Sequence, residues 1–172
     1  AIAVDSFEGV ERLAQAMQLT NAVIDVFVEV DIGQGRCGVA PGEAALQLAR
    51  LIARRSASLR FAGLQAYHGG AQHLRTVADR HAAIVEAAEK VNAVRRLLEA
   101  AETPADIVTG AGTGTFAHEA ASGAWTEIQP GSFMFEEGVP AERLYLIVEG
   151  KVVLETETEH GPVQIQAVAD GG

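Results

Sequence analysis

Two spacings of hydrophobic residues alternate along the first 125 residues of the chain. Short apolar runs are typical of parallel strands that are covered on both faces. Such runs occupy residues 1–4, 23–30, 59–64 and 107–108. Each run is followed by apolar residues at a spacing of three or four, which indicates helices with one buried face. We expect these helices at residues 10–17, 41–52, 72–101 and 116–121. Repeated strand-helix units predict right-handed crossovers and a parallel sheet or barrel.

The pattern changes after residue 125, where no helical spacing is found. Short strands separated by glycine-containing turns are typical of an antiparallel sheet. The expected strands are 144–148 and 151–156, with turns at Gly138, Gly150 and Gly161-Pro162. A complete eight-stranded α/β barrel typically needs about 250 residues, so a chain of 172 residues holds part of one. The predicted fold is therefore α/β, with a partial TIM-type barrel at 1–127 followed by a short antiparallel β-roll at 128–172.

Charge and composition narrow the classes of protein further. The 13 lysine and arginine residues against 23 aspartate and glutamate residues give a net charge of -10, which disfavours binding to nucleic acid or to anionic membranes. One cysteine excludes an internal disulfide, and no run of 18 apolar residues is present to cross a bilayer. The chain opens without a basic segment ahead of an apolar stretch, so no signal peptide is expected. These features favour a reduced, cytoplasmic setting.

Three segments at the expected strand ends contain the candidate functional residues. They read IDVFVEVDIGQGRCGV at 24–39, GLQAYHGGAQH at 63–73 and VTGAGTGTF at 108–116. Barrel enzymes place their active sites at the carboxyl ends of strands. The segments resemble those of fold-type III pyridoxal-phosphate enzymes with an alanine racemase-like barrel, in particular the D-threonine aldolase and D-serine dehydratase branch. The resemblance implies pyridoxal 5'-phosphate as cofactor. It also implies the activity of a lyase, with D-β-hydroxy amino acids as the small-molecule substrates. It also implies a divalent metal, whose ligands lie beyond the segment that resembles the family.

The glycine-rich loop at 109–115 has the composition of an anion-binding turn. Its glycines allow backbone N–H groups to approach a phosphate, and a helix is expected directly after it. By the resemblance, Gly112, Thr113, Gly114 and Thr115 contact the phosphate of the cofactor, with the two threonines as hydroxyl donors. A dinucleotide fingerprint fails because Thr115 occupies its third glycine position, and no Lys-Ser/Thr pair follows to make a P-loop. A tight turn without a ligand is the alternative.

The other candidate cofactor ligands are Arg36, Gln65, Tyr67 and His68. The resemblance matches Arg36 to the arginine that contacts the cofactor ring, and the alternative is a surface ion pair with Asp31 or Glu29. The resemblance gives His68 a supporting role beside that arginine, whereas a lone histidine is usually structural. Because neighbours along a strand face opposite ways, Gln65 and Tyr67 are expected to point inward and His68 outward.

Three further features have structural explanations. The histidines at 68, 73 and 81 are five and eight residues apart, which matches no zinc pattern, so no metal site is expected. Cys37 has no recognisable base partner and is expected to behave as a small buried residue. Asp5 precedes Ser6, and a cap of the first helix through Ser6 is expected.

The resemblance also limits what these 172 residues are expected to do. In this family a lysine holds the cofactor as a Schiff base, and that lysine precedes the segment with which this chain begins. The two lysines present, Lys90 and Lys151, lie in the middle of an expected helix and in the tail. We therefore expect the 172-residue polypeptide to be inactive as a lyase. The two open sheet edges of a partial barrel also favour association into a homodimer or aggregates.

The tail suggests a second class of function. The string IQPGSFMFEEGVPAERLYLIVEGKVVLE at 128–155 resembles the opening of a cyclic-nucleotide-binding domain, which is a small β-roll. The alternative function is thus a regulatory nucleotide-binding module fused to a barrel fragment. The Phe-Gly-Glu segment and the arginine that hold the cyclic phosphate in that family have no counterpart after Arg143, so no nucleotide binding is expected. The aldolase-like resemblance covers most of the chain, which favours the enzyme.

Overall fold

The computed structural model describes residues 1–128, 151–158 and 161–169. The chain divides into two compact units between Ser132 and Phe133. The change of architecture that the hydrophobic pattern predicts at 127–128 lies near this division.

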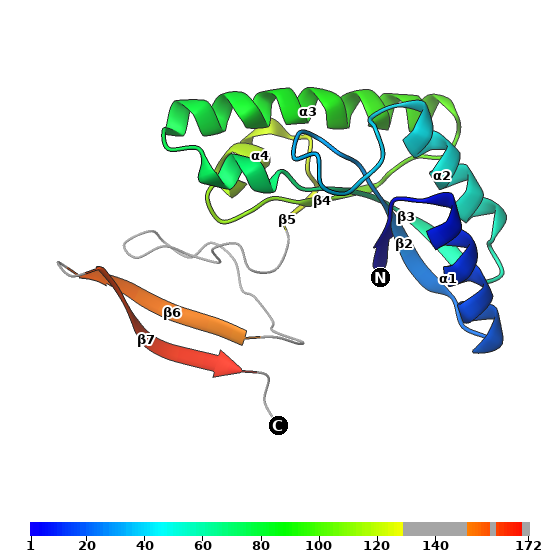
Figure 1. Cartoon of the computed structure of the whole chain (residues 1–172), viewed down its shortest axis with the longest axis horizontal. Coiled ribbons are helices and arrows are strands. Elements are labelled where there is room, and N and C mark those ends of the chain that lie inside the picture. Colours follow the sequence, from blue (N-terminus) through cyan, green and yellow to red (C-terminus); the bar gives the residue numbers. More distant parts are fainter. Residues whose placement is uncertain (129–150, 159–160, 170–172) are drawn as a thin grey trace. The chain divides into compact units, whose positions relative to one another are not determined.

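Strands and helices alternate through the first unit, as the hydrophobic pattern predicts (Figure 1). In chain order the elements are β1 (Ile2–Val4), α1 (Phe7–Leu19), β2 (Ile24–Glu29), α2 (Glu43–Arg54), β3 (Leu59–Ala66), the 3-10 helix η1 (Gly69–His73), α3 (Val77–Ala100), β4 (Ile107–Gly110), α4 (Phe116–Ser122) and β5 (Glu127–Ile128). All strand pairs are parallel, and the sheet has the order β1-β2-β3-β4-β5. The predicted α/β fold with a parallel sheet is confirmed.

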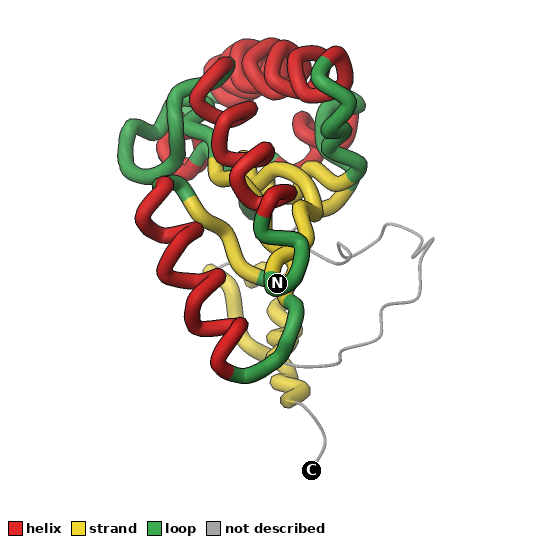
Figure 2. The backbone as a smooth tube through the Cα atoms, turned by 90° about the vertical axis from the view of Figure 1, so that its right-hand side faces the viewer, coloured by secondary structure: helices red, strands yellow, loops and turns green. Residues whose placement is uncertain are grey.

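One face of this sheet is buried beneath helices. Val28, Leu64 and Val108 are neighbours across β2, β3 and β4, and each is at most 1% exposed. They belong to one apolar core with the buried face of α2, which consists of Ala45, Leu48, Ala49 and Ile52. Figure 2 shows the helices of this unit running outside the strands. Burial of each large apolar side chain contributes about 1.5–3 kcal/mol, so this layer stabilises the strands.

The helix expected at 72–101 begins later than the hydrophobic pattern predicts. Residues 69–73 form η1, and α3 begins at Val77. The side chain of Thr76 accepts a hydrogen bond from the backbone N–H of Asp79 at 3.0 Å and caps the helix there. The helix ends at Ala100, ahead of Pro104 as predicted. The early residues are therefore available for contacts with the strand-end loops.

The described part of the second unit is an antiparallel pair of strands, β6 (Lys151–Thr158) and β7 (Gly161–Ala169). The predicted antiparallel character of these residues is confirmed, whereas the strand expected at 144–148 lies outside the described residues. The turn expected at Gly161-Pro162 is wrong, because these residues begin β7 and pair with Thr158 and Glu157. Proline is tolerated at the start of a strand. Among the described residues, no helix has the length and apolarity that a membrane span requires.

Candidate functional site

The loop after β2 is fixed in place by side chains from three parts of the fold. Asp31 Oδ1 accepts hydrogen bonds from the backbone N–H groups of Gly33 and Gly35, both at 3.0 Å. These bonds, that of Gly35 above all, lower the pKa of Asp31. Lys90 Nζ on α3 donates to the carbonyl oxygen of Ile32 at 3.3 Å. The loop that carries Arg36 is therefore an ordered segment rather than a free connection.

Asp5 has a different role from the expected one. Ser6 caps α1 by accepting a hydrogen bond from the N–H of Gly9 at 3.2 Å, as predicted. The Asp5 carboxylate instead accepts from the N–H of Gly38 at 3.1 Å, at the far end of the same loop. The end of β1 therefore helps to hold the segment after β2.

Arg36 is exposed, and among the described residues it forms no ion pair. Asp31, one of its two expected alternative partners, is occupied by backbone N–H groups. Burial, followed by the nearby Asp5 charge, raises the pKa of Glu29, and Arg36 only partly opposes this. The guanidinium is thus left available for a ligand. The neighbouring Cys37 is also exposed, so the expectation of a buried cysteine is wrong, because this loop turns toward solvent.

A row of polar side chains crosses the sheet on the face opposite to the helices. Glu29 pairs with Gln65, Gln65 with Thr109, and Thr109 with Glu127. The Thr109 hydroxyl donates to Glu127 Oε1 at 3.2 Å. Successive strand residues alternate in direction, so this row lies opposite Leu64 and Val108. The predicted inward direction of Gln65 agrees with this register, while its contact with a cofactor stays a prediction.

Tyr67 and His68 follow the last residue of β3, where regular alternation has ended. The imidazole of His68 lies against Gly33, whose φ of +145° favours glycine, and a Cβ at position 33 would lie 2.7 Å from Nε2 of His68. His68 Nδ1 is buried and has no hydrogen-bond partner among the described residues. Burial, assisted by the Lys90 charge, lowers the pKa of His68, so the imidazole is neutral at pH 7. Tyr67 is half-buried.

Two glutamine side chains tie the three strand-end loops together. Gln34, in the loop after β2, accepts a hydrogen bond from the N–H of Gly69 at 2.9 Å. Gln72, in η1 after β3, accepts from the N–H of Gly114 at 2.5 Å. Each bond joins one strand end to the next along the sheet. The three predicted segments therefore form one continuous edge, as barrel chemistry requires.

The glycine-rich loop has exposed and buried members. Thr113 and Gly114 are exposed, whereas Thr115 is 1% exposed. The Thr115 hydroxyl accepts from Gln72 Nε2 at 2.6 Å and donates to Glu119 Oε1 at 2.8 Å. The Thr115 hydroxyl is therefore engaged by two side chains, and its contact with the phosphate stays a prediction. The phosphate contacts of Gly112, Thr113 and Gly114 stay predictions.

Four residues that the sequence did not single out complete this edge: Gln34, Gln72, Glu119 and Trp125. The indole Nε1 of Trp125 donates to the carbonyl oxygen of Ala66 at 2.9 Å and so holds the end of β3. Of these four residues, Glu119 alone could have been found from the sequence, because it lies one helical turn after Thr115. A glutamine has no local sequence pattern that indicates a distant hydrogen-bond partner. No group of three metal-binding side chains is present in the described parts of the chain.

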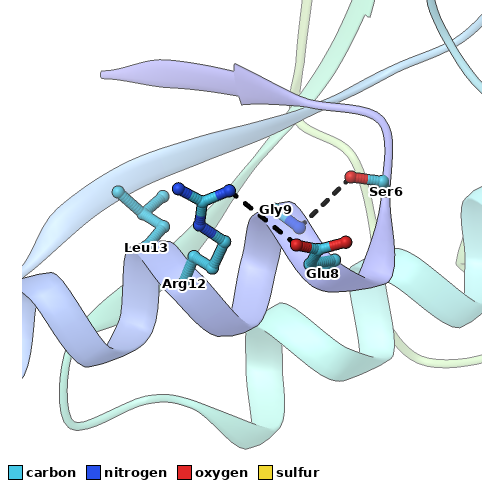
Figure 3. Close-up of a pocket in the computed structure, with 5 residues that line it drawn as sticks. All are labelled: Ser6, Glu8, Gly9, Arg12 and Leu13. Carbon is cyan, nitrogen blue, oxygen red and sulfur yellow. Dashed lines mark hydrogen bonds and ion pairs between the residues drawn. The ribbon is translucent and has the colours of Figure 1, made fainter.

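A surface hollow of about 530 Å³ lies on the first turns of α1 (Figure 3). Its five lining residues are Ser6, Glu8, Gly9, Arg12 and Leu13. The exposed Glu8 and Arg12 face each other there at 3.8 Å. None of the candidate ligands lines this hollow, and its groups are occupied by the cap and the ion pair of the helix. It is therefore not the candidate site.

The chain is similar in sequence and fold to known proteins. Residues 1–137 match the family model described as the alanine racemase N-terminal domain. The chain belongs to this family. The parallel sheet of the alanine racemase N-terminal domain is thus seen here in part, which confirms the predicted partial TIM-type barrel. The resemblance to fold-type III pyridoxal-phosphate enzymes is confirmed by the same match.

The curated relatives include two aldolases. A D-threonine aldolase of Arthrobacter sp is 44% identical over 138 residues, which are 80% of this chain and 36% of that protein. A 3-hydroxy-D-aspartate aldolase of Paracoccus denitrificans is 37% identical over 134 residues, or 78% of this chain and 34% of that protein. The chain therefore spans about a third of the length of these relatives.

Solved structures of a D-threonine aldolase and of an alanine racemase also match this chain. The D-threonine aldolase of Filomicrobium marinum superposes with a TM-score of 0.72 at 42% identity, and the match covers 75% of this chain and 35% of that one. An alanine racemase of Streptomyces coelicolor matches with a TM-score of 0.60 at 18% identity, covering 75% of this chain and 33% of the other. The second likeness is one of fold alone.

Proposed function

We propose that this chain forms the part of a pyridoxal 5'-phosphate site that lies at the ends of β2, β3 and β4, in a lyase for D-β-hydroxy amino acids. The observation that carries the proposal is the meeting of the three segments at one edge, where Gln34 and Gln72 join them. D-Threonine and 3-hydroxy-D-aspartate, named in the relatives, share the D configuration and a hydroxyl group on Cβ. The proposal extends this substrate class to the present chain.

The residues present fit the cofactor. Gly112 and Thr113 are not fully buried, so this part of the loop can approach a phosphate group from the side of solvent. The N–H of the exposed Gly114 is bonded to Gln72, so this glycine can contribute close approach of its backbone. The free guanidinium of Arg36 supplies a donor for an oxygen of the ring. His68 is neutral and lies against Gly33 with its Nδ1 atom buried, so it can support the ring without adding a positive charge.

Pyridoxal phosphate, when bound, withdraws electrons from the α-carbon of an amino acid, which cleavage of the bond between Cα and Cβ requires. The residues of this chain bind and orient. The loop at 111–114 would hold the phosphate, Arg36 would donate to an oxygen of the ring, and the row from Glu29 to Glu127 provides polar groups on the inner face of the sheet. Lys90 takes no part in covalent binding, because its Nζ is held by Ile32 and by Glu86.

Binding of a phosphorylated ligand without an aldehyde tests this proposal directly. Pyridoxamine 5'-phosphate should shift the backbone NMR signals of residues 112–114 and the side-chain signal of Arg36 in the 172-residue chain. Pyridoxamine, which lacks the phosphate, is the matched control and should shift the loop signals much less. Equal shifts with both compounds, or none with either, would contradict the proposal.

A further inference from the structure

The side chain of Gln72 joins η1 to the loop after β4 through both ends of its amide. Its Oε1 accepts from the N–H of Gly114 at 2.5 Å, and its Nε2 donates to the hydroxyl of Thr115 at 2.6 Å. These partners are adjacent residues of the loop, although Gln72 is more than 40 residues away in the chain, since the separations are 42 and 43. An amide held at both ends fixes the loop as a rigid unit.

Glu119 sets the direction of this chain of hydrogen bonds. The Thr115 hydroxyl donates to Glu119 Oε1 at 2.8 Å, and both side chains are 1% exposed. With its proton committed to Glu119, the Thr115 oxygen accepts only, so it must face Nε2 of Gln72 and not Oε1. The carbonyl end of the amide is thereby directed to Gly114. The buried carboxylate thus decides which way an exposed part of the loop is held.

Gly112 is needed for the same contact. A Cβ atom at position 112 would lie 2.5 Å from Cδ and Nε2 of Gln72, which is too close for any real side chain. The φ of Gly112 is outside the left-handed region, so its backbone conformation alone does not demand glycine. Part of the glycine-rich character of this loop is therefore explained by Gln72.

We propose that Gln72, oriented by Thr115 and Glu119, is a positioning residue that shapes the loop at 111–115 for binding of the cofactor phosphate. The inference rests on the proposed function and adds residues that touch no ligand to it. Binding to a preformed loop avoids the entropic cost of ordering it. Loss of the amide should then weaken binding of the phosphate group in particular. The opposite possibility is that Gln72 occupies the place of the anion, and its removal would then strengthen binding.

Four variants of the 172-residue chain separate these possibilities. Gln72→Ala removes the amide, and Thr115→Val removes the hydroxyl while keeping the shape of the side chain. Thr115→Ser restores the hydroxyl and is the conservative rescue. Gln47→Ala is the matched control, because the exposed Gln47 bonds Glu43 on its own helix, α2. Circular dichroism and thermal unfolding establish that each variant is folded.

Two measurements are made on each variant. Amide hydrogen exchange at Gly114 should become about tenfold faster in Gln72→Ala and in Thr115→Val, which is the effect of losing about 1.4 kcal/mol of hydrogen bonding. Affinity for pyridoxamine 5'-phosphate should fall by about tenfold in the same two variants. Thr115→Ser and Gln47→Ala should behave as the unmodified chain does in both measurements.

The outcomes distinguish the inference from the proposed function. Absence of binding by the unmodified chain overturns the proposed function, and the phosphate role of Gln72 with it. Binding that is unchanged or tighter in Gln72→Ala overturns the inference alone. Slower or unchanged exchange at Gly114 in that variant overturns it as well, whatever the affinity. Failure of Thr115→Ser to restore Gly114 protection would show that the hydroxyl does not orient the amide.

Discussion

The amide of Gln72 lies where a side chain on Gly112 would stand, with only 2.5 Å between a Cβ at 112 and the amide carbon and nitrogen. Glycine in a loop of this kind is usually assigned to close approach of an anion. Here a protein side chain makes that approach. A substitution at Gly112 therefore tests the packing of Gln72 before it tests ligand binding.

Replacing Gly112 with alanine should destabilise the fold by about 1 kcal/mol, because the new methyl group displaces the Gln72 side chain and breaks its hydrogen bonds. In a Gln72→Ala background the overlap is gone, so the same substitution should cost much less. A double-mutant cycle by chemical denaturation measures the coupling. Gly112→Ala in a Gln47→Ala background is the control and should keep its full cost. An additive result in the Gln72 cycle would mean that Gly112 serves the backbone turn only.

The charge on Lys90 should control the titration of His68. Burial and Lys90 lower the pKa of His68, whereas Asp31 and Glu86 raise it. Lys90→Gln is therefore expected to raise the pKa of His68, and Glu86→Gln to lower it, both measured by NMR titration of the imidazole. Lys90→Arg keeps the charge and should leave the pKa near that of the unmodified chain. If the pKa of His68 is unchanged in both Lys90→Gln and Glu86→Gln, the charge on Lys90 does not control its titration.

Glu119 should make the stability of the fold depend on pH. Burial raises the pKa of Glu119 above its ordinary value of 4.5, with the Thr115 hydrogen bond opposing. The folded state then binds the proton more tightly than the unfolded state, so the free energy of unfolding falls as the pH rises from 4.5 through the folded-state pKa. The Glu119→Gln variant should lack this fall, so its Tm relative to that of the unmodified chain should increase as the pH rises. Glu89→Gln, at an exposed position of α3, is the control, and an equal gain in that variant would refute the assignment.

The 172-residue polypeptide should hold pyridoxal 5'-phosphate without a specific covalent bond and should not cleave D-threonine. Lys90 is engaged by Ile32 and Glu86, and the only other lysine is Lys151. Borohydride reduction followed by peptide mass spectrometry gives the measurement, and D-threonine cleavage is assayed in parallel. Lys90→Arg is the control for incidental labelling. A single stoichiometric adduct together with turnover would defeat this prediction.

The tail should bind no cyclic nucleotide. Its likeness to the start of a nucleotide-binding roll stays a prediction, since the described residues after 150 consist of β6 and β7. No arginine follows Arg143 in the chain, so the cyclic phosphate lacks its bidentate partner. Calorimetry of the 172-residue chain with cyclic AMP and cyclic GMP should give no heat of binding. Saturable micromolar binding of either nucleotide would overturn it.

The alternation of strands and helices is predictable from the hydrophobic pattern, because burial of apolar side chains imposes a spacing that can be read along the chain. The helices at 41–52 and 72–101 were predicted with one buried face, and the structure buries one face of α2 and of α3. The three strand-end segments could also be identified from the sequence. Each follows an expected strand, and a parallel sheet brings successive carboxyl ends to one edge. Ser6 as a helix cap was also predicted, because a cap is a contact between near neighbours.

The polar groups that meet at that edge are known only from the folded structure. Gln34 and Gln72 bond residues that are 35 and 42 positions away, and glutamine has no local pattern that announces such partners. The start of α3 at Val77, the exposure of Cys37 and the binding of Gly38 by Asp5 were likewise missed. Each depends on which segments the folded sheet places side by side. Local spacing is fixed by the chain, whereas contacts between distant loops exist only after the strands have paired.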